Sequence, residues 1–433
     1  MVGGLASTKY KVKEEKMYKI RNIVVMLLLM SANFYFADTD LEKLTGLALE
    51  NNQEIKSLKE MVKTLEITSH KESSLEEPKI GAGIVNIPAS SFSFNEEDMT
   101  MVEFKFMQMF PFPGKLGLIG LSSGFNVKIA EQELAAKKNE IKEKVTKAYC
   151  EIVYLNKALE ISEKNKQLLK STAAIADEKY RSGTAMQSDV LKAQVEVSRM
   201  GLDINMLKQE KHSSLALLSA LLNEKREITL ESTVLERNKK ELNEEKIIAL
   251  ALQDNPELKI AALGVEKNKA DRDLAGSRLL PDFNISLSYG LRQDNPVTGM
   301  KRSGMVTLML DMSLPFLWGG AGFEVKENEA EKEVKKAGYE NTVNIITSML
   351  KEIVSKISKN RANIELYESG ILPQSRQNIN ISQEGYKSGK LDFLSLLDSQ
   401  MTLYKYELEY YRELAEHQKN FSGMETLIGG ELK

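Results

Sequence analysis

The 433-residue sequence predicts a mostly α-helical protein with a β-barrel part, built from two copies of one structural unit. A motif, Glu-x-Tyr-(Arg/Lys)-Ser-Gly, begins at Glu178 and again at Glu384, and in both copies a Gln follows at the same distance. Long segments with the apolar spacing of helices flank each motif, and a pair of segments with alternating apolar and polar residues precedes it. Because several residue types match at fixed offsets, a duplication explains the two motifs better than two unrelated turns do.

The repeat divides the chain into a leader and two halves. Residues 1–37 have the features of a secretory signal peptide: a basic segment, a short apolar run and small residues before a cleavage site near Ala37. Met17 is an alternative start of this leader. Residues 38–235 form the first repeat and residues 236–433 the second, and each is expected to contain a helix, a strand pair and a long helical hairpin.

A second stretch of internal similarity lies ahead of the strands. Residues 48–56 and 251–259 both read Ala-Leu-x-x-Asn-x-Glu-(Ile/Leu)-Lys. The first of these lies inside a predicted helical segment, residues 40–70. The duplication therefore extends well beyond the two motifs.

The composition excludes several classes of function. A formal net charge of −3 gives no electrostatic reason to expect nucleic-acid binding. His70, His212 and His417 lie far apart, and no nucleophile motif or phosphate loop is found, so we expect no enzyme, no cofactor and no metal site. The single cysteine, Cys150, has no disulfide partner and is expected to be a small buried apolar residue.

Four methionines raise one alternative to that expectation. Met101, Met107 and Met109 share one face of an alternating segment, and Met99 lies just before it. Thioether sulfurs are ligands for soft metal ions. Methionines that only fill space in packing are the favoured interpretation.

Four segments have the two-residue periodicity of strands: residues 79–87, 101–110, 283–291 and 305–314. One apolar and one polar face over about ten residues fit a membrane β-barrel, and a soluble sheet packed on one side is the alternative. The signal peptide favours the barrel. Open sheet edges are not tolerated in lipid and closed barrels begin at about eight strands, so these four strands would require a symmetric oligomer.

Long helices follow each strand pair. Residues 118–181 contain no Pro and predict a helix of roughly 95 Å. Apolar residues of this helix and of the return helix recur with the a/d spacing of coiled coils. Each motif then forms the tip of an antiparallel hairpin, with Gly183 and Gly389 in the left-handed conformation that commonly ends a helix. Pro373 is expected to interrupt the second hairpin, and residues 423–433 are expected to be irregular.

In this combination, the chain resembles the TolC family of outer-membrane efflux channels. The similarity is most specific over residues 386–404, and the Phe-Pro-Phe-Pro-Gly-Lys turn at residues 110–115 is similar to the heavy-metal (Czc- and Cus-type) branch. The resemblance implies a homotrimer in which four strands per chain form a 12-stranded barrel in the lipid of the outer membrane. A long periplasmic α-helical barrel would continue it and meet a periplasmic adaptor protein and an inner-membrane efflux pump.

The resemblance also implies roles for residues near the tips. Contact with the adaptor is expected at six tip residues: Ser182, Gly183, Thr184, Ser388, Gly389 and Lys390. The periplasmic gate is expected at Tyr386, Asp392, Ser395 and Asp398. Ser395 and Leu391 depart from the family pattern, which has an Asp and a gating Arg there. Asp392 or Asp189 is a candidate for the missing carboxylate, and a solvated helix residue is the alternative for each.

The function expected from these features is a passive exit duct for metal ions or small toxic compounds. Contact with the adaptor and the pump would open it. The alternative is a periplasmic coiled-coil structural or adaptor protein without a pore of its own.

Overall fold

The computed structural model describes residues 41–224, 230, 235, 237, 238, 240–296, 298–317 and 320–432, so the predicted signal peptide lies outside the described part. The first half contains α2 (Leu41–Asn51), α3 (Gln53–Glu72), β1 (Lys79–Val85), β2 (Met101–Phe110), α4 (Lys115–Arg181) and α5 (Gln187–Leu222). The second contains α6 (Glu244–Asp254), α7 (Pro256–Ser277), β3 (Phe283–Leu291), β4 (Met305–Met312), the 3-10 segment η1 (Pro315–Leu317), α8 (Gly320–Leu366), the π-helical segment η2 (Tyr367–Ile371), α9 (Leu372–Lys387) and α10 (Phe393–Ile428). The mostly helical fold with four strands is confirmed, while the repeat boundaries remain predictions.

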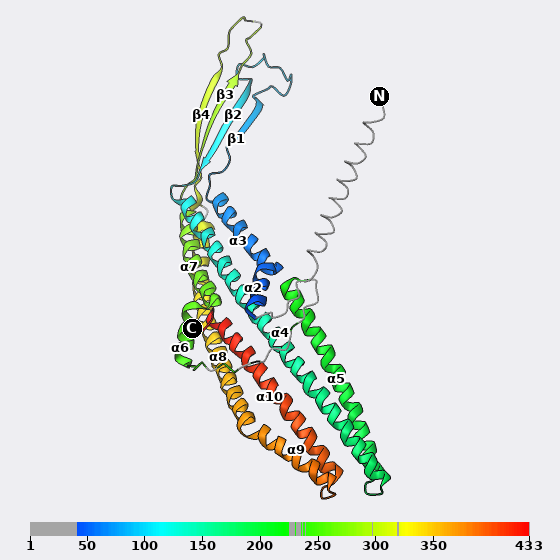
Figure 1. Cartoon of the computed structure of the whole chain (residues 1–433). Coiled ribbons are helices and arrows are strands. Elements are labelled where there is room, and N and C mark those ends of the chain that lie inside the picture. Colours follow the sequence, from blue (N-terminus) through cyan, green and yellow to red (C-terminus); the bar gives the residue numbers. More distant parts are fainter. Residues whose placement is uncertain are drawn as a thin grey trace, which may run out of the picture.

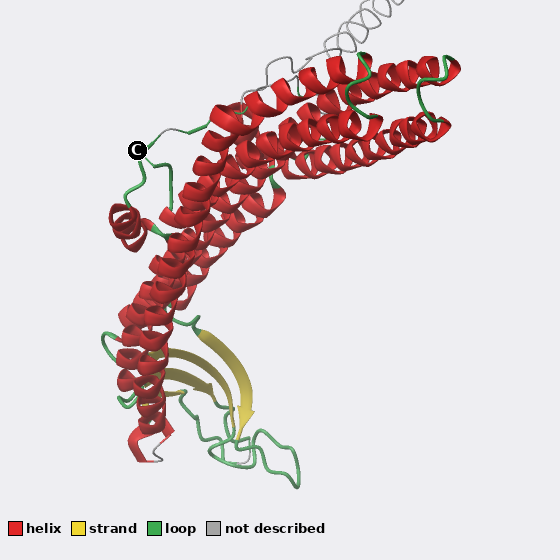
Figure 2. Ribbon diagram, turned by 90° about the horizontal axis from the view of Figure 1, so that it is seen from below, coloured by secondary structure: helices red, strands yellow, loops and turns green. Residues whose placement is uncertain are grey.

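The molecule is elongated, with the strands at one end and two helical hairpin tips at the other (Figure 1). Helix α4 is 67 residues long and runs through the centre, where it packs against α3, α5, α7 and α10. Seen from below, the helices form one continuous arc with the curved sheet at its end (Figure 2). Among the described residues, no helix combines the length and the apolar character needed to cross a membrane.

The four strands form one antiparallel sheet in the order β1-β2-β3-β4. The central pairing, β2 with β3, joins the two halves of the chain, with Phe104 opposite Tyr289. The Pro-rich turn after β2 is fixed to the start of β3, because Asp282 accepts hydrogen bonds from the Phe112 backbone N–H (2.9 Å) and from Lys115 Nζ (2.7 Å). The two halves are therefore joined into one sheet within a single chain.

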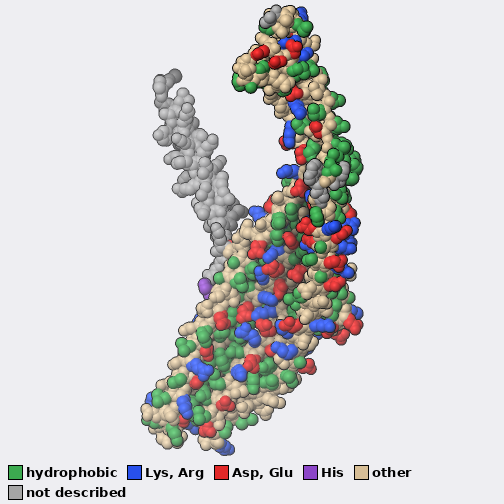
Figure 3. Space-filling view, turned by 180° about the vertical axis from the view of Figure 1, so that it is seen from behind, with side chains coloured by type: hydrophobic (Ala, Val, Ile, Leu, Met, Phe, Trp, Pro, Cys, Tyr) green, Lys and Arg blue, Asp and Glu red, His purple; other side chains and the backbone are tan. Residues whose placement is uncertain are grey.

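The register of the strands gives the sheet one apolar face. Residues that share this face by pairing are Ile80, Ala82, Ile84, Val102, Phe104, Phe106, Gln108, Phe110, Phe283, Ile285, Leu287, Tyr289, Leu291, Val306, Leu308, Leu310 and Met312. Most are exposed in the single chain, and Ile80 and Leu308 reach 83% and 74% exposure. Hydrophobic side chains accordingly gather along one side of the strand region in Figure 3. The alternation predicted from sequence is confirmed, and its apolar face has no partner within the described chain.

The helical segment predicted at residues 40–70 is broken at Asn52, between α2 and α3. Asn52 Oδ1 caps α3 by accepting from the Glu54 and Ile55 backbone N–H groups, and Nδ2 donates to the Leu221 carbonyl (3.2 Å). Asn255 repeats this arrangement between α6 and α7, where Nδ2 donates to the Leu427 carbonyl (2.8 Å). The shared Asn of the two similar stretches is thus a helix cap that also ties down the end of a long return helix.

The second hairpin departs from a regular helix at two places. Pro373 lies in the first turn of α9, and the preceding π-helical segment η2 absorbs the irregularity: the Leu372 N–H bonds the Tyr367 carbonyl, five residues back. The predicted interruption is confirmed. The expectation that residues 423–433 are irregular was wrong for its first half, because α10 continues to Ile428 and Gly423 is buried in its packing.

Replacing Asn52 or Asn255 by Ala should lower the free energy of unfolding by roughly 1–3 kcal/mol each, because each loses a cap and leaves a carbonyl without its donor. Thermal unfolding of the purified protein followed by circular dichroism measures this. Asn51→Ala, at an exposed neighbouring position, is the control. Equal melting temperatures for Asn52→Ala and Asn51→Ala would contradict the assigned role.

Candidate functional site: the paired hairpin tips

Both hairpin tips have the same backbone geometry. After α4, the Thr184 N–H bonds the Lys179 carbonyl (2.8 Å) and the Gly183 N–H bonds the Tyr180 carbonyl (2.9 Å). After α9, the Lys390 and Gly389 N–H groups make the corresponding bonds at 2.8 and 3.1 Å. Both glycines have φ of +75°, which non-glycine residues rarely adopt. The predicted left-handed glycines are confirmed, and each tip is a Schellman turn.

The tip side chains satisfy the carbonyl groups that the helix ends leave free. Ser182 Oγ donates to the Lys179 carbonyl and Ser388 Oγ to the Glu384 carbonyl, both at 2.9 Å. Thr184 Oγ1 also donates to the Lys179 carbonyl (3.1 Å). All six predicted contact residues are exposed, and a Cβ on either glycine would meet no atom within 4 Å. The tips are therefore small, rigid and open to another molecule.

Tyr386 lies beneath the second tip and joins the two hairpins. It is 4% exposed, and its ring packs edge-on against Phe393 with 5.8 Å between centroids. From the first hairpin, Lys179 Nζ lies 4.7 Å from the centre of the Tyr386 ring and donates to the Tyr386 carbonyl (2.6 Å). Burial, and then the negative charge of Asp189, raises the pKa of Tyr386. The sequence pointed to Tyr386 but not to Lys179, the cation that holds it.

Two predicted gate residues serve as a helix cap. Asp392 Oδ1 accepts from the Ser395 backbone N–H (2.8 Å), and Oδ2 accepts from Ser395 Oγ (3.1 Å). These hydrogen bonds hold the pKa of the Asp392 carboxyl below its usual value. Both side chains are thus engaged with each other at the start of α10. A gate role for either remains a prediction.

Asp398 lies one turn further along α10 and is exposed. It lines a groove between α5 and α10 together with other charged residues: Glu196, Arg199, Asp203, Lys405 and Glu409. Among the predicted gate residues, Asp398 is therefore the one whose carboxylate is directed to open space rather than to a cap. Its place in a gate also remains a prediction.

Above the tips, a buried polar contact joins α4 to α10. Gln400 Nε2 donates to Asn165 Oδ1 (3.3 Å), and Thr172 Oγ1 donates to Gln400 Oε1 (3.4 Å). Ser162 Oγ and Tyr404 Oη share a further hydrogen bond (3.0 Å). The Gln at the end of the repeated motif was the sequence signal for this contact, although the a/d spacing indicated only apolar packing there.

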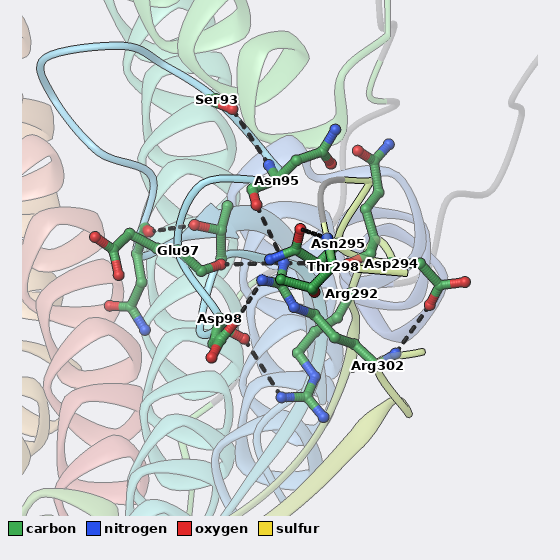
Figure 4. A network of polar contacts seen from close by, with 12 residues as sticks. Ser93, Asn95, Glu97, Asp98, Arg292, Asp294, Asn295, Thr298 and Arg302 are labelled. Atoms are coloured by element: carbon green, nitrogen blue, oxygen red, sulfur yellow. Dashed lines mark hydrogen bonds and ion pairs between the residues drawn. The ribbon is translucent and has the colours of Figure 1, made fainter. Parts of the chain in front are cut away.

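A second polar network closes the opposite end of the molecule, where the loop of residues 86–100 meets that of residues 292–304 (Figure 4). The Arg302 side chain is only 4% exposed, forms an ion pair with Asp98, and donates to the Asn95 carbonyl (3.4 Å). Both loops are rich in polar residues. A basic residue in one loop and acidic residues in the other were the available signal, but sequence does not show that they meet.

The remaining titratable candidates are structural. Burial raises the pKa of Cys150 to about 12, so this thiol is unreactive at neutral pH. Burial, and then the charges of Arg361 and Arg237, lowers the pKa of His417 to about 4. His417 stacks on Phe421 in the helical core. The prediction that Cys150 is buried is confirmed.

The long helical hairpins with Gly tips, joined to a strand pair in each half, define the class of outer-membrane channel proteins with a periplasmic helical extension. The chain belongs to the outer membrane efflux protein family, whose family model matches residues 122–224 and 247–430. The resemblance found from sequence is confirmed. Proteins of this family are outer-membrane channels, so neither an enzyme nor a periplasmic adaptor without a pore agrees with the assignment.

Individual relatives are distant in sequence but similar along most of the chain. The cobalt-zinc-cadmium resistance protein CzcC of Cupriavidus metallidurans is 21% identical over 306 residues, which is 70% of each chain. The CusC crystal structure superimposes with a TM-score of 0.76 at 16% identity, covering 92% of this chain and 93% of that one. The outer-membrane protein VceC of Vibrio cholerae gives a TM-score of 0.76 at 17% identity, covering 91% and 97%. These structures establish the common fold.

Replacing Lys179 by Met should loosen the two tips, because a charged hydrogen bond of roughly 1.5–3 kcal/mol and a cation–π contact are lost while an unbranched, uncharged side chain is kept. Spin labels at Ser182→Cys and Ser388→Cys report the distance between the tips by pulsed electron paramagnetic resonance. We expect a longer and broader distribution.

The control for this experiment is Lys387→Met, which removes an equal charge whose ion-pair partner among the described residues is the exposed Glu384. The native Cys150 is buried and does not compete for label. If Lys179→Met and Lys387→Met give the same distribution as the parent, Lys179 does not hold the tips together.

Proposed function

We propose that this protein is the outer-membrane channel of a tripartite efflux system, in which three copies form a continuous passive duct. A periplasmic adaptor and an inner-membrane pump open it at the tips. The observation that carries this proposal is the sheet, whose apolar face is exposed and whose outer strands β1 and β4 each have one unpaired edge in the described chain. Three copies supply twelve strands, enough for a closed barrel in lipid.

The internal repeat supports an assembly of several copies, because it indicates what covers the outer face of α5. Leu191, Val195 and Leu202 on α5 are 54%, 62% and 65% exposed. Their equivalents 206 residues later, Leu397, Met401 and Leu408, pack against buried residues of α4. In the repeat, α5 is equivalent to α10, and α8 with α9 is equivalent to α4. If α5 of one copy packs on α8 and α9 of the next as α10 packs on α4, these apolar side chains become covered and each copy binds the next in a ring.

This assembly predicts a specific contact between copies. By the offset of 206 residues, Thr172 corresponds to Asn378 and Gln400 corresponds to Gln194. The counterpart of the Thr172–Gln400 hydrogen bond would therefore join Asn378 of one copy to Gln194 of its neighbour. The variant Gln194→Cys/Asn378→Cys should therefore give dimer and trimer bands with a short thiol-reactive crosslinker, measured by denaturing gel electrophoresis. Each single variant is the control. A double variant that remains monomeric after crosslinking would contradict the arrangement.

Opening of the duct follows from the contacts beneath the tips. Lys179 and Tyr386 hold the first and second hairpins of one chain together, and the small Ser-Gly turns outside them are free for an adaptor. An adaptor that binds the separated tips more tightly than the closed ones shifts the population toward the open state. Asp398 from three copies, with the other groove carboxylates near it, would form a ring that favours cations and repels anions.

We propose metal ions or small toxic compounds as the exported class. The relative CzcC is by name a cobalt-zinc-cadmium resistance protein, and the Pro-rich turn at residues 110–115 has the pattern that suggested the same branch. The test is a deletion strain complemented with this chain and grown with each metal in turn. The metal content of its lysate is measured, and an exported metal should be lower than in the strain without the chain.

Replacing Gly389 by Asp should abolish export while leaving the trimer intact, because a carboxylate is placed on the proposed contact surface. The measurement is tolerance of a complemented deletion strain, with trimer content checked on unheated gels. Gly389→Asn is the matched control, since Asn has the same size and also tolerates φ of +75°. Normal export by Gly389→Asp would remove this tip from the contact surface.

A further inference from the structure

The polar face of the sheet carries five methionines from two strands. The strand register places Met101, Met107 and Met109 of β2 on the same face as Met305 and Met309 of β4. The apolar face carries a single methionine, Met312. The sequence showed the β2 set, but only the pairing of the strands brings the β4 set beside it.

The strand between these two sets, β3, has small residues on this face, and methionines extend over them. Ser286 pairs with Met107 on one side and Met309 on the other, and it is 3% exposed although its neighbours are more open. A Cβ placed on Gly290 would lie 2.2 Å from the Met101 sulfur, and Gly290 pairs on its other side with Met305. The thioether of Met101 thus occupies the space above β3, and Met305 flanks that space.

A third row across the sheet adds oxygen donors. Asn284 pairs with Met109 on β2 and with Asp311 on β4. Its Nδ2 donates to Asp311 Oδ2 (3.5 Å), whereas its Oδ1 is buried and accepts no hydrogen bond from any described residue. The Asn284 oxygen and the Asp311 carboxylate are hard ligands, so they give no preference for a soft ion, and any such preference on this face comes from the thioethers.

We infer that this face binds soft monovalent cations, Cu(I) and Ag(I), through pairs of methionine sulfurs held over β3. Thioethers prefer such ions to Zn²⁺ or Co²⁺, which favour imidazole, thiolate and oxygen ligands. The β2 and β4 side chains of one pair start about 9.5 Å apart, two strand spacings, so two methionines reaching inward can share one ion between them. The inference rests on the proposed function only in taking this face as the inner wall of the duct.

Charge alone does not explain this selection. Lys79 and Lys105 share the face with Glu103 and Asp311, so the formal charges cancel. Uncharged sulfur ligands hold an ion weakly enough to release it, as a conduction path requires. Packing of the methionines against one another explains the arrangement less well, because Met309 is 47% exposed on a face that is otherwise polar.

The test is titration of the full-length purified trimer with Ag⁺, followed by calorimetry and by X-ray absorption at the silver edge. The parent should bind Ag⁺ with silver–sulfur scattering. The variant Met101→Leu/Met107→Leu/Met305→Leu/Met309→Leu should lose this saturable binding, since Leu keeps the volume but removes the sulfur. Met312→Leu, on the opposite face of β4, is the matched control and should bind as the parent does.

Unchanged Ag⁺ binding by the four-fold variant, or an equal loss in Met312→Leu, would overturn the inference. Trimer content and outer-membrane fractionation of the same variants are measured in parallel. If the parent forms no trimer, the proposed function fails, whatever the silver result. If trimers form and the four methionines do not affect Ag⁺ binding, only the thioether site fails.

Discussion

The structure depends on a sheet that one chain cannot complete. The four strands pair fully with one another, but β1 and β4 leave a row of free backbone groups at each edge. The same sheet exposes a mostly apolar face, in which Gln108 and the hydroxyl group of Tyr289 are the polar groups. Water penalises the apolar face and lipid penalises the open edges, so neither solvent suits the isolated sheet. In the proposed assembly, closure with further copies would remove the open edges, and lipid could then cover the apolar face without leaving backbone groups unpaired.

Duplication makes such closure geometrically simple. Within the chain, β2 pairs with β3 and α4 packs on α10, so the first half already contacts the second half along its whole length. The same contact, repeated from the second half of one copy to the first half of the next, would need no new kind of surface. Asn52 and Asn255 show how closely the halves agree, since each caps one helix and fixes the end of another with the same two groups.

Sequence predicted the elements well where the signal was local. The strand limits, the left-handed Gly183 and Gly389, and the break near Pro373 each follow from the chemistry of a few neighbouring residues. Long-range partners could not be predicted in this way. Lys179 is one of many lysines on a charged helix, and the sequence around it gives no sign of a contact with Tyr386, which lies 207 residues away in the chain.

Other features required the register of the sheet or the fold of the loops. The sequence showed that the methionines of β2 share one face. That Met309 of β4 lies beside them follows only from the strand register, in which Ser286 of β3 pairs with both Met107 and Met309. Asp392 was predicted as a gate residue because it lies near Ser395 and could supply the carboxylate that the family pattern has at that position. The structure shows the simpler use that its position also allows, a cap on α10. A carboxylate at the start of a helix can act as a helix cap or as a gate residue, and the sequence does not distinguish these two roles.

The two halves are not equivalent at the tips, and the difference has a structural origin. Buried residues Ile141 and Ile346 are offset by 205 positions, whereas Tyr180 and Tyr386 are offset by 206. The second half therefore has one more residue than the first between these two positions. The π-helical segment η2 lies in this interval, and its wider turn accommodates one extra residue.

The consequence appears at the repeated motif itself. The position of Lys179 in the first half is taken by Gly385 in the second, where a Cβ would meet Leu391 Cδ1 at 2.6 Å. Lys179 covers Tyr386 of the second hairpin, which is 4% exposed. Gly385 has no side chain that could cover Tyr180 of another hairpin in the same way, and Tyr180 is 43% exposed. The charged link at the tips therefore forms within a chain, and the proposed trimer would have no equivalent link between chains. In the proposed trimer, this single residue would leave the six hairpins as three linked pairs. Separation of the pairs from one another would keep the Lys179 contact, whereas separation of the two hairpins within a pair would break it.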